Sequence, residues 1–203
     1  MNHRVVLSCL WFSVFLALTP RASTAQAPPS DRQVAAAILA GPAGQRDGAT
    51  VLGFDSTGHV VTLRKGSNEL VCLGDDPTDD RFSVACYHES LEPYMARGRE
   101  LVSQGISDAN ERLQIRWKEA EEGALPMPEN PATLYVLSGS AYDPEAGEVE
   151  ESYLRYVVYM PWATVESTGL SDAPMGPGGP WLMYPGTPGA HVMISPPRPS
   201  PGG

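Results

Sequence analysis

Closely spaced turn residues in the N-terminal half of the chain constrain the fold more than any other sequence feature. Strand-like runs at 51–54, 59–63 and 69–73 are separated only by the turn residues 55–58 and 65–68. A connection between neighbouring parallel strands needs about a dozen residues or more, and these turns are much shorter. The spacing therefore predicts an antiparallel meander in this part of the chain.

Helical patterns lie on both sides of this meander. Ser30 and Gln33 have the spacing of a capping box, and they precede the helix-forming run 34–40. Two longer stripes of apolar residues predict helices at 91–104 and 107–122. Because only a short break separates these two helices, we expect them to form a helical hairpin.

A strand-like run at 81–86 precedes the two longer helices, and strand-like patterns resume after them at 133–137, 153–162, 181–184 and 191–194. Both faces of the run 153–162 are largely apolar. Tyr153, Arg155, Val157 and Tyr159 share one face, and Leu154, Tyr156, Val158 and Met160 share the other. This pattern is typical of a central strand.

Strands, then two helices, then strands again predict a single α+β domain. We expect an antiparallel sheet with the helical pair on one face and one disulfide. The domain is predicted to span residues 26–194. Residues 195–203 are rich in proline and glycine and are predicted to form a disordered tail.

The N-terminus has the three parts of a secretory signal peptide: a basic start ending at Arg4, an apolar run from Val5 to Leu18, and small residues before Ala25. We predict cleavage near Ala25, so that residues 1–25 are removed and the protein is secreted or periplasmic. The apolar run is shorter than the roughly 20 residues that a membrane-spanning helix needs. We therefore expect no membrane span after cleavage.

Cleavage also changes the charge and the cysteine count. The formal charge of the whole chain is −10, and it becomes −12 because residues 1–25 contain two arginines and no acidic residue. A protein this acidic repels phosphate backbones, which argues against nucleic acid as a partner. Removal of Cys9 leaves Cys72 and Cys86, and in an oxidising compartment this pair predicts a disulfide.

Several short segments carry a resemblance that covers most of the mature chain. They are Cys72–Pro77, Cys86 before a helix, Gly179–Tyr184, Gly186–Pro188 and His191–Ile194. With these segments the chain resembles a group of uncharacterised bacterial secreted proteins. The resemblance implies an extracytoplasmic bacterial origin, and it carries no activity or site residue.

Two sets of residues are candidates for binding a metal ion. His88, Glu89 and His191 offer the imidazole and carboxylate ligands of a metal-binding protein or a metal-dependent hydrolase. No His-Glu-x-x-His pair supports this, and Glu89 also suits the start of the following helix. Imidazoles more than about 10 Å apart could not share one zinc ion, whose ligand bonds are about 2.0 to 2.1 Å long.

The second set is the acidic loop between the cysteines. Its four aspartates offer the hard oxygen ligands that calcium prefers, and they are Asp75, Asp76, Asp79 and Asp80. They lack the alternating spacing that wraps a loop around the ion. A solvated acidic loop is the simpler interpretation.

Aromatic residues gather in the last third of the chain, where they could form a binding surface or fill the core. The candidate surface residues are Tyr153, Tyr159, Trp162, Trp181 and Tyr184. Our leading hypothesis is a non-catalytic module that binds an extracytoplasmic ligand or protein through this surface and needs no cofactor. A contiguous exposed aromatic patch would support it.

Overall fold

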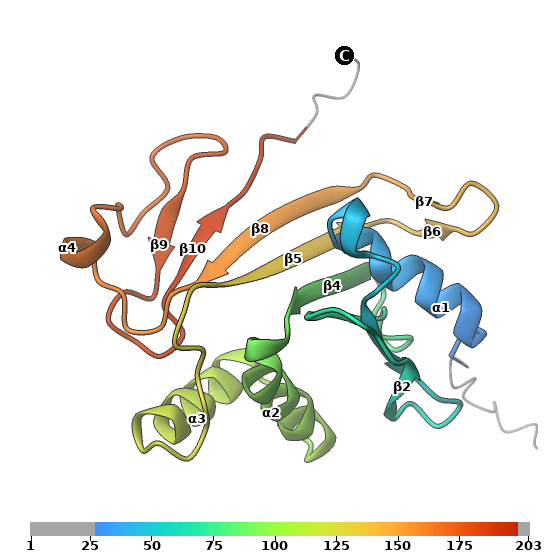
Figure 1. The fold of residues 1–203 in the computed structure, drawn as a ribbon, viewed down its shortest axis with the longest axis horizontal. Helices are drawn as coiled ribbons and strands as arrows, with labels where there is room; N and C mark the ends of the chain where they lie inside the picture. The colour runs from blue at the N-terminus through green and yellow to red at the C-terminus, as the bar shows by residue number, and fades with distance from the viewer. Residues whose placement is uncertain (1–26, 199–203) are drawn as a thin grey trace, which may run out of the picture.

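The computed structural model describes residues 27–198 and consists of one strongly curved sheet with helices on both faces (Figure 1). The α+β class and the largely antiparallel sheet are as predicted. The predicted signal peptide lies outside the described residues. Within residues 27–198, every helix is too short or too polar to cross a membrane.

The elements follow the predicted order. The helices and 3-10 turns are α1 (Ser30–Ala37), η1 (Ile38–Ala40), η2 (Ala43–Gln45), η3 (Glu89–Leu91), α2 (Glu92–Ser103), α3 (Ala109–Glu121) and α4 (Val165–Thr168). The strands are β1 (Thr50–Phe54), β2 (Val60–Arg64), β3 (Leu70–Leu73), β4 (Phe82–His88), β5 (Ala132–Gly139), β6 (Tyr142–Asp143), β7 (Glu148–Val149), β8 (Tyr153–Tyr159), β9 (Trp181–Met183) and β10 (His191–Ile194). The large sheet has the order β2-β1-β3-β4-β5-β8-β10-β9, and β6 pairs with β7 in a small hairpin.

The predicted antiparallel meander is wrong at one pairing, because β3 lies parallel to β1. Strand β2 runs back along β1, so its last residue Arg64 lies opposite Val51 near the start of β1. The connection then needs only to pass the beginning of β1, where the Gly66 N–H donates to the Thr50 hydroxyl over 3.0 Å. The prediction excluded a parallel pair because the turns are too short for a long crossover. Here strand β2 itself forms part of the crossover between β1 and β3.

The predicted disulfide is confirmed. Cys72 and Cys86 lie directly opposite each other in β3 and β4, with Cα atoms 4.0 Å apart, and they are bonded. Both side chains are fully buried under α1 and η1 in a core made largely of small residues. The bond closes the acidic loop at its base. We call this side of the sheet the α1 side.

Helix α1 begins without the predicted capping box. No side chain caps its N-terminus, and Ser30 is its first helical residue. The Gln33 side chain is buried instead, and its amide donates to the Phe54 carbonyl over 2.9 Å and accepts from the Phe54 N–H over 2.8 Å. A buried amide needs such partners. These two hydrogen bonds of Gln33 therefore connect α1 to the end of β1.

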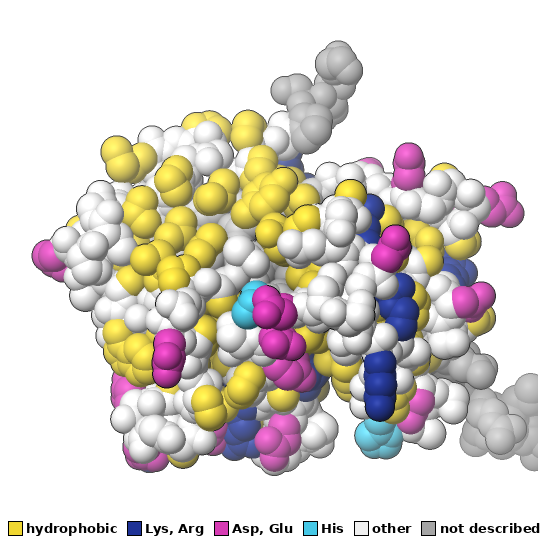
Figure 2. Space-filling view, viewed as in Figure 1, with side chains coloured by type: hydrophobic (Ala, Val, Ile, Leu, Met, Phe, Trp, Pro, Cys, Tyr) yellow, Lys and Arg dark blue, Asp and Glu magenta, His cyan; other side chains and the backbone are white. Residues whose placement is uncertain are grey.

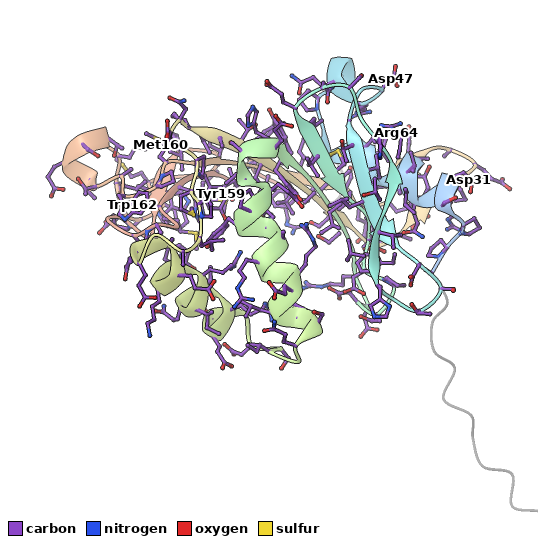
Figure 3. The ribbon with its side chains drawn as sticks, turned by 60° about the horizontal axis from the view of Figure 1, so that its bottom comes forward. Asp31, Asp47, Arg64, Tyr159, Met160 and Trp162 are labelled. Carbon is purple, nitrogen blue, oxygen red and sulfur yellow. A yellow bond between two sulfur atoms is a disulfide. The ribbon has the colours of Figure 1, made fainter. Side chains whose placement is uncertain are left out.

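Helices α2 and α3 form the predicted hairpin on the opposite side of the sheet, which we call the hairpin side (Figure 3). The core there is aromatic, and its buried residues include Tyr87, Leu91, Tyr94, Ala132, Val157 and Tyr159. Arg97 on α2 pairs with Glu119 on α3 over 2.6 Å. The Trp117 indole N–H donates to the Tyr94 hydroxyl over 3.2 Å. These contacts hold the hairpin together and against the sheet.

The last two strands complete the sheet and pack against α3. The turn between them approaches the helix closely, because a Cβ added to Gly189 would lie 2.3 Å from Trp117 Nε1. The outer edge of β9 is covered where the Leu182 N–H donates to the Ser171 carbonyl over 2.7 Å. Residues 195–198 of the predicted tail contain no helix or strand and pass beside Tyr153, whose hydroxyl donates to the Pro196 carbonyl over 3.0 Å.

Candidate functional site

The structure does not bring His88 and His191 together. They lie on β4 and β10, with β5 and β8 between them, so about 14 Å of sheet separates them at about 4.8 Å per strand. His88 shares the α1 side with Cys86, whereas His191 shares the hairpin side with Met193. This geometry excludes one zinc ion shared by the two imidazoles. Residues 27–198 contain no group of three or more His, Cys, Asp or Glu side chains that could hold a metal ion.

His191 is part of the aromatic core. Only 7% of it is exposed, and its ring centroid lies 5.0 Å from that of Tyr159 and 5.7 Å from that of Tyr184. Its Nδ1 lies 2.8 Å from the Gly189 carbonyl, which requires the protonated Nδ1 as donor. Burial lowers the pKa of His191 below its ordinary value, and the hydrogen bond to Gly189 partly offsets this. These contacts indicate a structural role.

His88 lies between Glu69 and Ser90. Its Nε2 is 3.2 Å from a Glu69 carboxylate oxygen, and its Nδ1 is 2.9 Å from the Ser90 hydroxyl. A carboxylate, a histidine and a serine in this order are the parts of a hydrolase triad. However, the Ser90 backbone N–H also donates to Nδ1, which makes His88 the cap of η3, and the side chain of Glu69 is 73% exposed. We interpret the arrangement as a helix cap.

The carboxylates of the acidic loop bind the loop's own backbone. Asp75, Asp76 and Asp79 accept hydrogen bonds from the N–H groups of Ser83, Thr78 and Arg81 over 2.8 to 3.2 Å. Partial burial raises the pKa of Asp75. Asp80 is exposed at the tip of the loop. The four side chains do not converge on one point, and the arrangement favours a solvated loop over the calcium site.

The predicted aromatic surface is not one exposed patch. Tyr159 lies on the hairpin side under the helices, and only 9% of it is exposed (Figure 3). Tyr184 packs on Trp117 with ring centroids 5.1 Å apart, and the Tyr153 ring is covered by the Arg198 guanidinium at 4.2 Å. Trp181 is half-buried on the edge strand β9. Of the five predicted residues, only Trp162 is among the exposed large apolar side chains, at 49%.

A different row of apolar residues lies on the α1 side, and one of its members, Tyr156, is among the exposed large apolar side chains. Tyr135, Tyr156 and Ile194 form one row across β5, β8 and β10, and Val158 lies beside that row. We call these four residues the open face. The rings of Tyr135 and Tyr156 meet edge to face with centroids 6.1 Å apart, and Tyr156 is 37% exposed. Figure 2 shows hydrophobic side chains gathered over β8, β9 and β10.

A polar hollow of about 380 Å³ borders the open face. Tyr135 belongs to both, and the hollow is also lined by Gln45, Asn68, Glu69, Leu70, His88 and Thr133. Glu69 gives this hollow a carboxylate beside His88. Figure 2 shows acidic side chains beside a histidine near the middle of the visible face.

The sequence predicted a binding surface with Tyr153 and Tyr159 on the hairpin side of β8, and the open face was not predicted. Apolar residues on both faces of the run 153–162 predict a strand that is covered on both sides, so they gave no signal of an open face. Helix α1 has only 8 residues, and η1 adds 3. At about 1.5 Å per residue such a short segment covers only a few strands. The open face is the part that it does not reach.

No known protein family, no curated protein and no solved structure matches this chain. The resemblance to secreted bacterial proteins stays a prediction. Any function must therefore be argued from the geometry alone.

Proposed function

We propose that this chain is an exported, non-catalytic binding domain that docks a protein partner on the open face. The observation that supports it most is the row Tyr135, Tyr156 and Ile194, an apolar strip across three strands in which Tyr135 packs against the α1-side core and Tyr156 is 37% exposed. Aromatic residues on such a strip are typical of the centre of a protein interface. The closed disulfide is consistent with an oxidising compartment.

The charge around the open face indicates the chemistry of the partner. Glu69 lines the hollow that shares Tyr135 with the open face, and the whole chain has a formal charge of −10. A second copy of the same chain would place like charges against each other, which is unfavourable. We therefore propose a partner with apolar side chains flanked by lysine or arginine.

A pull-down with three forms of the protein tests this proposal. Tyr156→Asp places a charge in the middle of the open face. Val102→Asp is the matched control, since Val102 is also an exposed apolar residue, at 51%, but lies on α2. Each form is immobilised at equal density and exposed to an extract of the producing cells. Bound proteins are quantified by mass spectrometry, and thermal melting verifies that all three forms are folded.

We expect at least one basic protein that is retained by the wild type and by Val102→Asp and is lost with Tyr156→Asp. Replacing a central interface aromatic costs about 2 kcal/mol or more, which corresponds to a roughly 30-fold weaker affinity for the isolated pair. If nothing is retained, or if the three forms retain the same proteins equally, the proposal is wrong.

A further inference from the structure

A second hollow lies on the opposite side of the sheet and has a volume of about 680 Å³. Its floor is formed by neighbouring strands whose side chains point to the hairpin side. Ser83, Ser138 and Tyr153 form one row, and Ala85, Val136 and Arg155 form the next. Of these six residues, Ser83, Ser138, Tyr153 and Arg155 line the hollow, and the two serines are small and leave room above the sheet. Arg81 and Arg198 line the same hollow from the acidic loop and from the C-terminal segment.

The arginines of this hollow differ from the others in the described chain. Residues 27–198 contain ten arginines, and seven of them donate side-chain hydrogen bonds: Arg32, Arg46, Arg64, Arg97, Arg99, Arg112 and Arg116. The other three are Arg81, Arg155 and Arg198. All three line this one hollow, and none of them forms an ion pair with another described residue.

Arg155 is the most constrained of the three. Its Nε is buried, and among the described residues it is the one buried side-chain nitrogen or oxygen without a hydrogen-bond partner. Buried donors are almost always paired, because leaving one unpaired is unfavourable. A guanidinium can donate two parallel hydrogen bonds to one carboxylate or phosphate group. A carboxylate or phosphate group would therefore supply the hydrogen-bond acceptor that Arg155 Nε lacks.

We propose that this hollow binds a small molecule through a single oxyanion group, carboxylate or phosphate, which is held by Arg155. Arg81 and Arg198 add positive charge on either side. The Ser83 hydroxyl lies on the floor and supplies a further donor, whereas the Ser138 hydroxyl donates to the Tyr153 carbonyl over 3.4 Å. Because this hollow and the open face lie on opposite sides of the sheet, the site is independent of the docking proposed above.

The acidic residues around the hollow limit the ligand further. Asp79, Asp80 and Glu151 also line it, so the three arginines face three carboxylates. These carboxylates repel a polyanion more strongly than a ligand with one oxyanion group, whose charge Arg155 can balance. The Arg198 guanidinium over the Tyr153 ring provides a flat wall at 4.2 Å from the ring centroid. We infer a ligand with one anionic end and a neutral or cationic body.

Binding is measured by nuclear magnetic resonance on the full protein. Inorganic phosphate and acetate are the probes, and chloride at equal ionic strength is the control. We expect saturable shifts at the Ser83, Ser138 and Tyr153 amides and at the Arg155 Nε–H. Arg155→Gln should weaken the tighter probe at least about tenfold, since hydrogen bonds to charged groups are strong. The probe that binds more tightly identifies the group as phosphate or carboxylate.

Two controls keep the test decisive. Arg32→Gln removes an exposed arginine outside the hollow, and Tyr156→Asp alters the open face; both should bind the probe as the wild type does. If Arg155→Gln is unfolded, Arg198→Gln replaces it, because Arg198 is exposed and its loss should still weaken binding about threefold. Shifts that chloride reproduces, shifts that do not saturate, or equal affinity in the variants and the wild type would overturn the proposal.

Discussion

The two sides of the central sheet are covered in different ways. On the hairpin side, 12- and 13-residue helices lie over an aromatic core that reaches from β3 to β10. On the α1 side, the alanines of an 8-residue helix pack with the disulfide and with larger residues such as Leu70 and Phe82; beyond the helix Tyr156 on β8 is exposed, although Val192 and Leu182 on β10 and β9 are buried. The difference shows that the length of the covering helix decides which apolar residues become core. An apolar side chain in a strand is not enough.

Strand β8 contains both situations within four residues. Tyr159 points to the hairpin side and is 9% exposed, whereas Tyr156 points to the α1 side and is 37% exposed. Tyr159 contacts Tyr94 and His191, with ring centroids 5.8 and 5.0 Å away. Tyr156 has one aromatic neighbour, Tyr135. The same residue type on one strand therefore serves stability at one position and leaves a surface free at the other.

The strongest test of this comparison truncates the two tyrosines separately. Tyr159→Ala removes a buried ring and should lower the free energy of unfolding by about 3 to 5 kcal/mol. Tyr156→Ala removes one cross-strand aromatic contact and should cost about 1 kcal/mol or less. Urea unfolding followed by circular dichroism measures both. Equal losses in the two variants would show that the open face is part of the core.

The disulfide provides the next test, since it replaces bulky packing on the α1 side. Cys72 and Cys86 close a loop with a sequence separation of 14 residues, for which chain entropy gives about 3 kcal/mol. We expect the Cys72→Ala, Cys86→Ala double variant to lose about that much stability in urea.

Chemical reduction of the wild type is the control for the double variant, because it opens the loop but keeps both sulfur atoms. A larger loss in the double variant than in the reduced protein would measure the packing of the sulfurs against α1. An unchanged unfolding midpoint after reduction would mean that α1 and its alanines hold this side without the crosslink.

Much of the fold follows from the sequence, because its local signals agree. The predicted helices at 91–104 and 107–122 correspond to α2 and α3, and the predicted strand at 191–194 is β10. The cysteine pair is also correct, since only two cysteines remained to be joined. Such features depend on residues close together in the chain or on counting, and these are what a sequence shows directly.

The features that depend on distant segments were not predicted. The parallel pairing of β1 with β3 arises because β2 pairs with the other edge of β1. Gln33 matched a capping pattern, yet its amide bonds Phe54, 21 residues away. The exposure of Tyr156 depends on where α1 ends, and the hollow at Arg155 depends on small residues from the two strands β4 and β5. Arg155 itself was visible as a charged residue within an apolar strand, and that signal could have marked the hollow.

The smallest expected effect is a dependence of folding stability on pH, which we expect from His191 on the covered hairpin side. Burial among Tyr159 and Tyr184 lowers the pKa of His191 below the ordinary 6.5, so the unfolded chain takes up a proton at a higher pH than the folded one. Stability should therefore fall as the pH drops below 6.5, by at most about 1.4 kcal/mol per pH unit. Urea midpoints between pH 7.5 and 5.5 measure the slope. His191→Gln should flatten it; a slope that survives in this variant comes from another group.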